Sequence, residues 1–243
     1  MCALYPDLLN IYADRGNLLV LERRCRWRGI GFEASSSGLG DRLDPGAHDL
    51  FYIGGGQDRD QELCAEDLLA TKARALREAH ANERLVLGIC GGYQLLGHSY
   101  ALAGETIEGV GLLDVRTVRE PGPRLIGNVA FEVSPTLTGT EDGRPRVLAG
   151  FENHGGRTRL GAGATPLGRV LRGHGNDGRS GWEGAFSGHT IGTYLHGPLL
   201  PKNTWFADWL IATALGLDEH ELAPLPDELE RDAHAGALRV AGV

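Results

Sequence analysis

One local pattern occurs twice in succession and constrains the fold more than any other feature of the sequence. A short apolar run at 49–53 opens into a glycine loop, and an amphipathic helix is predicted at 60–79. A second apolar run at 84–89 opens into Cys90-Gly91-Gly92, and 93–102 is again predicted to be helical. Apolar runs of this length are typical of buried strands. Strands that alternate with helices predict an α/β fold, a mostly parallel sheet with helices on both faces.

The rest of the chain is predicted to form one domain with a short appendage. A helix is expected at 17–28 and another at 201–215, which Gly216 would end. After residue 105 the strands lie between Gly-, Pro- and Arg-rich turns, which indicates a more antiparallel half. These strands are expected at 112–118, 128–133, 147–152 and 190–195.

The C-terminal residues differ in composition from the rest of the chain. We expect a main domain over 1–217 and an acidic, helical tail over 218–243. Pro226-Asp227-Glu228 is a typical helix start. An apolar stripe is expected along Leu225, Leu229, Ala233 and Ala237. Two interpretations stay open, a terminal helix that frays and an element that docks onto something.

The charge balance and the apolar runs exclude several classes of protein. The 243 residues contain 24 Lys and Arg against 32 Asp and Glu, a net charge of −8. This balance argues against a nucleic-acid-binding surface, which needs a basic patch. No apolar stretch reaches the roughly 18 residues of a membrane span. The first seven residues lack the basic and apolar regions of a secretory signal, so a cytoplasmic location is expected.

The four cysteines are Cys2, Cys25, Cys64 and Cys90, and no two are spaced as C-x-x-C. A zinc cage is therefore not predicted, and no metal site is expected. Free thiols in a reducing compartment are the simple interpretation, with Cys90 as the exception.

The segment Gly88-Ile89-Cys90-Gly91-Gly92 has the form of a nucleophile elbow, with Cys in place of Ser. Such a sharp strand-to-helix turn needs glycines on both sides, because side chains there would clash. The start of the next helix favours a thiolate, and the N–H of Gly91 is placed to bind an oxyanion.

A cysteine nucleophile needs a base, normally a histidine that the fold brings near. The candidates are His154, His174, His189 and His196. His196 follows the predicted strand 190–195, which is a rigid position for a base. His189 precedes that strand and is expected at its far end, and His174 lies in a turn where we expect it to be solvated.

Three motifs occurring together resemble the class I glutamine amidotransferases. They are Gly54-Gly55-Gly56-Gln57-Asp58, Gly88-Ile89-Cys90-Gly91-Gly92-Tyr93-Gln94 and Tyr194-Leu195-His196-Gly197. The last is typical of the branch that contains cobyric acid synthase. Within this branch, segments 5–12, 53–58 and 150–158 are similar to GatD proteins, the glutaminase subunits of lipid II isoglutaminyl synthase. The resemblance runs from about residue 3 to about 217 and implies the flavodoxin-like class I amidotransferase fold.

The resemblance implies a role for each matching residue. Cys90 would attack the side-chain amide of L-glutamine, release ammonia and form a γ-glutamyl thioester, with His196 as the base. Gly55 and Gly91 would supply the oxyanion donors. Gln94 and Arg124 would bind the substrate glutamine, Arg124 through its α-carboxylate.

The sequence departs from most class I amidotransferases at one position. They orient the catalytic histidine with a Glu two residues later, where this chain has Pro198. The cobyric-acid-synthase-like branch also lacks this Glu. Either another group replaces it or a partner completes the site. Glu152 and His154 lie in a motif shared with the branch and are candidates for supporting the site.

The resemblance also implies a partner, because the chain has no G-x-x-x-x-G-K-[ST] loop with which to use ATP. We expect a heterodimer with a MurT-like ATP-dependent ligase subunit, on which ATP and Mg²⁺ would bind; no cofactor is expected in this chain. The ligase would amidate the D-glutamate α-carboxylate of lipid II, at the inner face of the membrane. Three alternatives stay open: a subunit for a cobalamin-type acceptor, a stand-alone Cys–His γ-glutamyl hydrolase, and a non-catalytic scaffold.

Overall fold

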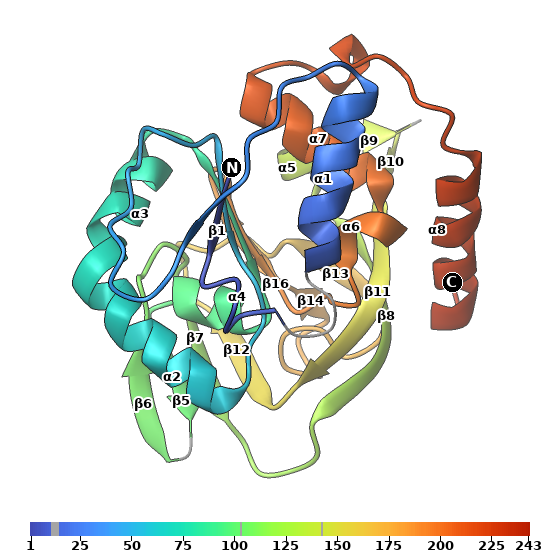
Figure 1. Ribbon diagram of the computed structural model, residues 1–243. Coiled ribbons are helices and arrows are strands. Elements are labelled where there is room, and N and C mark those ends of the chain that lie inside the picture. The colour runs from blue at the N-terminus through green and yellow to red at the C-terminus, as the bar shows by residue number, and fades with distance from the viewer. Residues whose placement is uncertain (11–14, 103, 142) are drawn as a thin grey trace.

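A six-stranded sheet forms the centre of the computed structural model, which describes all residues except 11–14, 103 and 142 (Figure 1). The strand order is β15-β16-β4-β3-β1-β2, and only β15 of these six runs antiparallel to its neighbour. The predicted mostly parallel α/β sheet is therefore confirmed. Its strands are β1 (Cys2–Leu4), β2 (Ser35–Ser37), β3 (Leu50–Ile53), β4 (Leu85–Ile89), β15 (Ala185–Ser187) and β16 (Thr190–Thr193).

Helices cover both faces of this sheet, as predicted. In Figure 1, α2 (Asp58–Asp67) and α3 (Ala73–Ala81) lie on one side, and α1 (Arg15–Trp27) and α7 (Thr204–Leu215) lie on the other. The predicted helix at 60–79 is present but contains a π-helical turn at Leu68–Lys72. The apolar positions of these helices close a continuous core over the strands, which are almost fully buried.

The prediction of a helix at 93–102 was wrong in its second half. α4 ends after six residues (Gly91–Leu96), and β5 begins at Ser99 (Ser99–Leu102). Gly97 has an extended backbone at the junction, and a Cβ there would lie 2.8 Å from the Val115 side chain. Close packing of the chain at this glycine turns it away from the helix axis and into β5.

The second half of the chain is mainly antiparallel, as predicted. One four-stranded sheet has the order β11-β8-β13-β14 and another has the order β12-β7-β5-β6. A bridge between Phe151 and His196 joins β11 to the chain beyond β16. The strands are β6 (Glu105–Glu108), β7 (Val115–Arg119), β8 (Leu125–Val133), β11 (Val147–His154), β12 (Gly156–Leu160), β13 (Gly168–Arg172) and β14 (Trp182–Glu183), with a separate hairpin of β9 (Thr140–Glu141) and β10 (Arg144–Pro145).

Three short helices complete the main body: α5 (Pro135–Thr138), α6 (Leu199–Lys202) and the 3₁₀ turn η3 (Glu219–Glu221). Among the described residues, no helix is both long and apolar enough to cross a bilayer.

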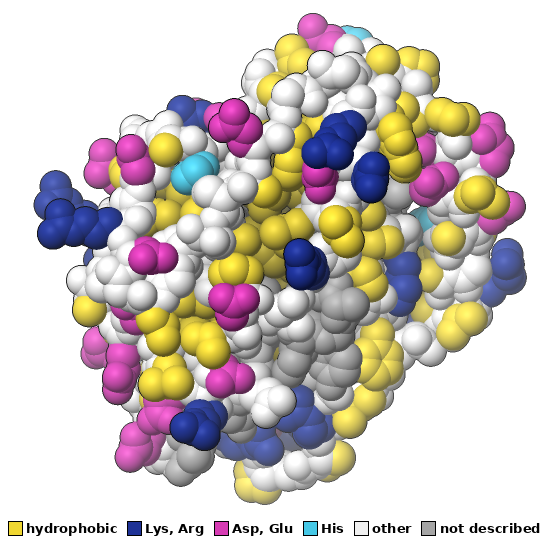
Figure 2. Space-filling view, in the orientation of Figure 1, with side chains coloured by type: hydrophobic (Ala, Val, Ile, Leu, Met, Phe, Trp, Pro, Cys, Tyr) yellow, Lys and Arg dark blue, Asp and Glu magenta, His cyan; other side chains and the backbone are white. Residues whose placement is uncertain are grey.

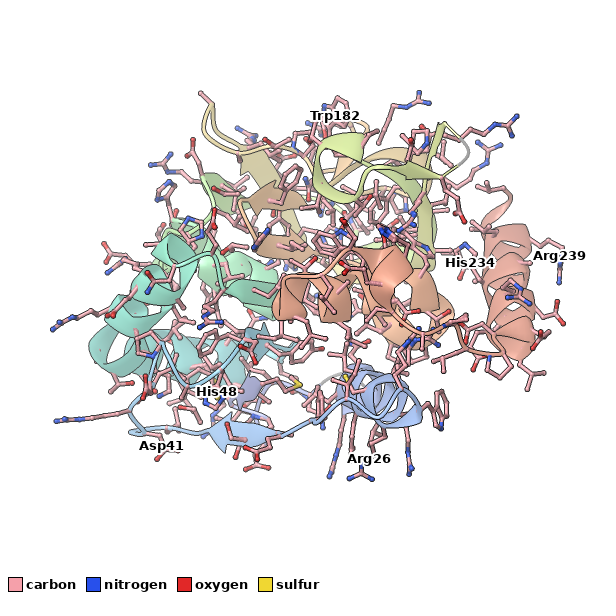
Figure 3. All side chains as sticks on the ribbon, turned by 90° about the horizontal axis from the view of Figure 1, so that it is seen from above. Arg26, Asp41, His48, Trp182, His234 and Arg239 are labelled. Carbon is pink, nitrogen blue, oxygen red and sulfur yellow. The ribbon has the colours of Figure 1, made fainter. Side chains whose placement is uncertain are left out.

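The C-terminal segment forms α8 (Glu228–Ala241), which packs beside β11 and β8 (Figure 1). His234 points toward the body and its Nδ1 donates to the carbonyl of Lys202 at 2.8 Å, while Arg239 points away (Figure 3). The predicted apolar stripe is not the packing face, because Leu229 is 80% exposed. The backbone at the start of α8 is instead held by Asp227, which binds the buried Arg24 of α1 at 2.6 Å.

Candidate active site

Three loops meet at the carboxyl edge of the parallel sheet. β3 leads into Gly54–Gly56, β4 into Cys90, and β16 into Tyr194 and His196. Register places Ile53 beside Gly88 and Thr193 beside Ile89, so the loops leave the sheet together. The N–H of Cys90 donates to the Thr193 carbonyl at 2.8 Å. The structure thus brings the predicted Cys90, His196, Gly55 and Gly91 to one edge, where open α/β sheets keep their sites.

The backbone at Cys90 has the geometry of a nucleophile elbow. Its φ of 50° and ψ of −101° lie outside the regions that a side chain normally allows. A conformation of this kind costs about 1–3 kcal/mol and persists only when the surroundings enforce it. The turn lifts the cysteine out of the line of β4 and leaves it 8% exposed.

Glycines on both sides of Cys90 make this turn sterically feasible. A Cβ on Gly92 would lie 2.2 Å from the Ile53 carbonyl oxygen, and one on Gly91 would lie 2.0 Å from the Gln61 amide nitrogen. A Cβ on Gly88 would meet the Gly92 backbone at 2.8 Å. The close approach that the sequence motif predicts is therefore present at all three glycines.

The oxyanion donors predicted from the sequence lie on the two loops beside Cys90. The N–H of Gly92 donates to the Gly54 carbonyl at 3.1 Å, which ties the elbow to the Gly54–Gly56 loop. No described residue accepts a hydrogen bond from the N–H of Gly91. Gly55 lies in the middle of the neighbouring loop, so both glycines lie beside the cysteine.

His196 is fully buried beyond the end of β16. Its N–H donates to the Phe151 carbonyl at 2.7 Å, which fixes its backbone against β11. Burial, together with the nearby His154 and Arg124, lowers the pKa of His196 to about 3. The imidazole is therefore neutral near pH 7.

The two predicted glutamine-binding residues have different surroundings. Arg124 is an exposed residue before β8. Its Nε donates to Asn153 Oδ1 and its Nη2 to the Asn153 carbonyl, both at 2.8 Å. Gln94 is half-buried in α4, and its Nε2 donates to the Tyr194 hydroxyl at 3.1 Å. Arg124 therefore lies in a fixed orientation near His196, whereas the amide nitrogen of Gln94 is engaged by the protein.

Sequence reasoning missed a buried network behind the site, centred on Tyr194. The Tyr194 hydroxyl lies 2.6 Å from Thr158 Oγ1, which lies 2.7 Å from Thr117 Oγ1. The Tyr194 ring stacks on His154 with centroids 3.6 Å apart. Burial, and to a smaller extent the nearby Cys90, raises the pKa of Tyr194 to about 12. Tyr194 therefore connects the elbow to β7 and β12.

Two of the remaining candidates from the sequence, Glu152 and His154, lie beside this network. Glu152 is buried and accepts hydrogen bonds from the N–H groups of His174, at 2.6 Å, and Gly175, at 2.9 Å. His154 Nδ1 donates to the Gly156 carbonyl at 2.9 Å. His174 is exposed and His189 lies at the amino end of β16, as predicted. Glu152 therefore holds the loop at 174–175.

A separate cavity lies at the opposite edge of the parallel sheet from Cys90. A cavity of about 720 Å³ lies at the amino ends of β1 and β3 beside α1 and α7, and Figure 2 shows apolar side chains gathered in that hollow. Within the described parts of the chain, no group of three His, Cys, Asp or Glu side chains is arranged to hold a metal.

Comparison with known proteins agrees with this geometry. Residues 1–204 match the family model of the CobB/CobQ-like glutamine amidotransferase domain. The chain belongs to this family.

Individual relatives specify which proteins of this family the chain resembles. The chain is 38% identical over 213 residues to the GatD subunit of lipid II isoglutaminyl synthase (glutamine-hydrolysing) from Streptococcus pneumoniae, covering 87% of this chain and 78% of the relative. Identity to GatD from Staphylococcus aureus is 38% over 236 residues, covering 96% and 90%. A cobyric acid synthase from Pelotomaculum thermopropionicum is 38% identical over 162 residues, which are 63% of this chain and 30% of that protein.

Solved structures share the fold. PurLQS from Thermotoga maritima matches with a TM-score of 0.57 and 23% identity, over 80% of this chain and 85% of that one. A glutamine amidotransferase from the same organism matches with a TM-score of 0.53 and 20% identity, over 99% and 92%. The α/β amidotransferase fold expected from the sequence is thus confirmed. Within segment 5–12, which resembles GatD, Ile11 and Tyr12 lie outside the described residues.

Proposed function

We propose that this chain hydrolyses L-glutamine with Cys90 as nucleophile and His196 as base. The observation that carries the proposal is the strained elbow at Cys90 beside a buried, neutral histidine on the neighbouring strand end. Cys90 is in the position of a nucleophile, and His196 is in the protonation state that a base requires.

The reaction runs through two acyl-transfer steps. His196 accepts the thiol proton of Cys90, and the sulfur attacks the side-chain amide carbon of glutamine. The resulting oxyanion is bound by the N–H groups of Gly91 and Gly55. Collapse of this intermediate breaks the C–N bond, and the proton held by His196 leaves with the ammonia. Water then attacks the γ-glutamyl thioester and releases glutamate.

Arg124 orients the substrate in this scheme. Its guanidinium is held by Asn153 through Nε and Nη2, and Nη1 has no hydrogen bond among the described residues. A guanidinium in a fixed orientation suits a carboxylate, which it binds more specifically than a flexible ammonium does. We assign the α-carboxylate of glutamine to Arg124, while Gln94 contacts the substrate from α4.

The ammonia serves a second subunit. The relatives that share most of this chain's length are named as the GatD subunit of lipid II isoglutaminyl synthase. By analogy, the partner is a MurT-like ligase that carries ATP and Mg²⁺ and amidates the D-glutamate α-carboxylate of lipid II. The complex works in the cytoplasm at the inner face of the membrane, which only the partner contacts.

Glutamate release from L-glutamine tests this function. Wild type and Cys90→Ala are measured alone and with the candidate ligase. Release that disappears in Cys90→Ala and increases at least about tenfold with the ligase supports a partner-completed glutaminase. Full activity without a partner would favour a stand-alone hydrolase. No release in any sample would favour a scaffold.

A further inference from the structure

The chain between β16 and His196 needs support that the sheet does not give. The β16 ladder ends at Thr193, so the N–H groups of Tyr194 and Leu195 have no strand partner. Glu183 Oε1 accepts the N–H of Tyr194 and the hydroxyl of Thr193, both at 2.7 Å. Thr193 Oγ1 in turn accepts the N–H of Leu195 at 3.0 Å. One carboxylate therefore organises the three residues that precede His196.

Glu183 reaches this position because successive side chains of β14 point to opposite faces of the sheet. Trp182 points outward, is 41% exposed and lies at the periphery of the molecule (Figure 3). Glu183, the next residue along the strand, points to the opposite face and is 1% exposed. The loop behind it is fixed by Asn176, whose side chain pairs with the N–H and carbonyl of Gly184 at 3.0 and 2.9 Å.

The burial of this carboxylate costs free energy that its contacts offset only in part. Oε2 of Glu183 is buried and has no hydrogen-bond partner among the described residues. A half-satisfied buried carboxylate is destabilising, and such groups are retained where they serve a function.

We propose that Glu183 is a positioning residue for glutamine hydrolysis, holding the Thr193–Leu195 backbone and thereby the imidazole of His196 over Cys90. The carboxylate acts through the main chain of the histidine and not through its ring. This inference rests on the proposed role of His196 as the base.

The test uses four full-length proteins in complex with the candidate ligase: wild type, Thr193→Val, Thr193→Ser and Glu183→Gln. Valine keeps the shape of threonine but removes the hydroxyl that links Glu183 to Leu195, and serine retains that hydroxyl. Thr193→Val and Glu183→Gln should lower kcat about 10- to 100-fold with KM for glutamine changed less than about threefold, because misplacing a base by around 1 Å has effects of this size. Thr193→Ser should stay within about threefold of wild type in both.

Alkylation of Cys90 by iodoacetamide gives a second readout that does not depend on turnover. The rate at pH 7 should fall in Thr193→Val and Glu183→Gln and not in Thr193→Ser. Unchanged kcat and alkylation in the first two variants would overturn the proposal. Equal losses in Thr193→Val and Thr193→Ser would also overturn it, because the hydroxyl would then be irrelevant. If Cys90→Ala still releases glutamate, the proposed function itself fails, which is a distinct result.

Discussion

At the scale of single residues, the site depends on charge states that burial sets. His196 stays neutral because it is buried and near Arg124 and His154, and Glu183 is a buried carboxylate whose pKa burial raises to about 7. Cys90 and His196 were predictable from their motifs. Glu183 was not, since a lone Glu after an exposed Trp in a two-residue strand has no periodicity that would mark it as buried.

Arg124→Ala should raise KM for glutamine at least about tenfold with a smaller effect on kcat, because in the role we propose the guanidinium binds the α-carboxylate in both ground and transition states. Steady-state kinetics with glutamine checks this. Arg42→Ala, a change at an exposed arginine that forms no ion pair with any described residue, is the matched control and should leave KM unchanged. An unaltered KM in Arg124→Ala would remove Arg124 from the site.

Glu183→Gln should change the pH dependence of stability in a defined direction. The native pKa of Glu183, about 7, lies above its ordinary value of 4.5. The native state therefore binds this proton more tightly than the unfolded state. Its stabilising contribution is complete below about pH 4.5 and is lost as pH rises through 7, by at most roughly 3 kcal/mol.

Melting temperatures of wild type and Glu183→Gln from pH 5 to 8.5 test this expectation. The melting temperature of the variant relative to wild type should increase with pH. The depressed pKa of His196 removes stability as pH falls from 6.5 toward 3, but it does so in both proteins and cancels in the difference. Parallel curves would show that Glu183 does not titrate in this range.

At the scale of elements, the elbow is the part of the molecule whose structure could best be predicted from the sequence. β3, β4, α1 and the α2–α3 segment follow from apolar periodicity, and the glycines around Cys90 follow from steric necessity. The three-residue strands β1 and β2 were not predicted, since so few residues carry no periodicity. The end of α4 was mispredicted because the packing of Gly97 against Val115 comes from a distant strand.

Gly92→Ala should destabilise the protein by about 2 kcal/mol or more and suppress glutamine hydrolysis. Its Cβ would lie 2.2 Å from the Ile53 carbonyl, a backbone atom that cannot move without distorting β3. Urea unfolding measures the change in free energy. The matched control is Gly31→Ala, where nothing lies within 4 Å of the added Cβ. Equal stability of the two variants would contradict the close packing at the elbow.

At the scale of the whole molecule, the C-terminal segment is anchored to the main body. Arg24, 1% exposed, pairs with Asp208 of α7 and Asp227 before α8, each at 2.6 Å. The division into a domain at 1–217 and a tail at 218–243 stays a prediction. The structure nevertheless shows α8 in contact with β11 and β8, and Asp227 paired with Arg24 of α1. The partners of this ion pair are about 200 residues apart, so no local sequence pattern indicates it.

Asp227→Asn should release the start of α8. Removing one charge from a buried ion-pair cluster typically costs about 3–5 kcal/mol, and the remaining pairing of Arg24 with Asp208 should reduce this to about 1–3 kcal/mol. Limited proteolysis should then cut between residues 217 and 228 sooner than in wild type. Asp232→Asn, on the exposed side of α8, is the control. Identical cleavage rates in all three proteins would show that Asp227 does not anchor the helix.

The central claim, that Cys90 is the nucleophile for glutamine, is tested most directly by covalent trapping. The protein is incubated with a diazoketone analogue of glutamine, whose carbon forms a thioether with an attacking cysteine as N₂ leaves, and the adduct is located by peptide mass spectrometry. We predict one adduct, on Cys90, absent in Cys90→Ala and suppressed by excess L-glutamine. An adduct on Cys2, Cys25 or Cys64, or glutamine turnover that persists once Cys90 carries the adduct, would contradict the account.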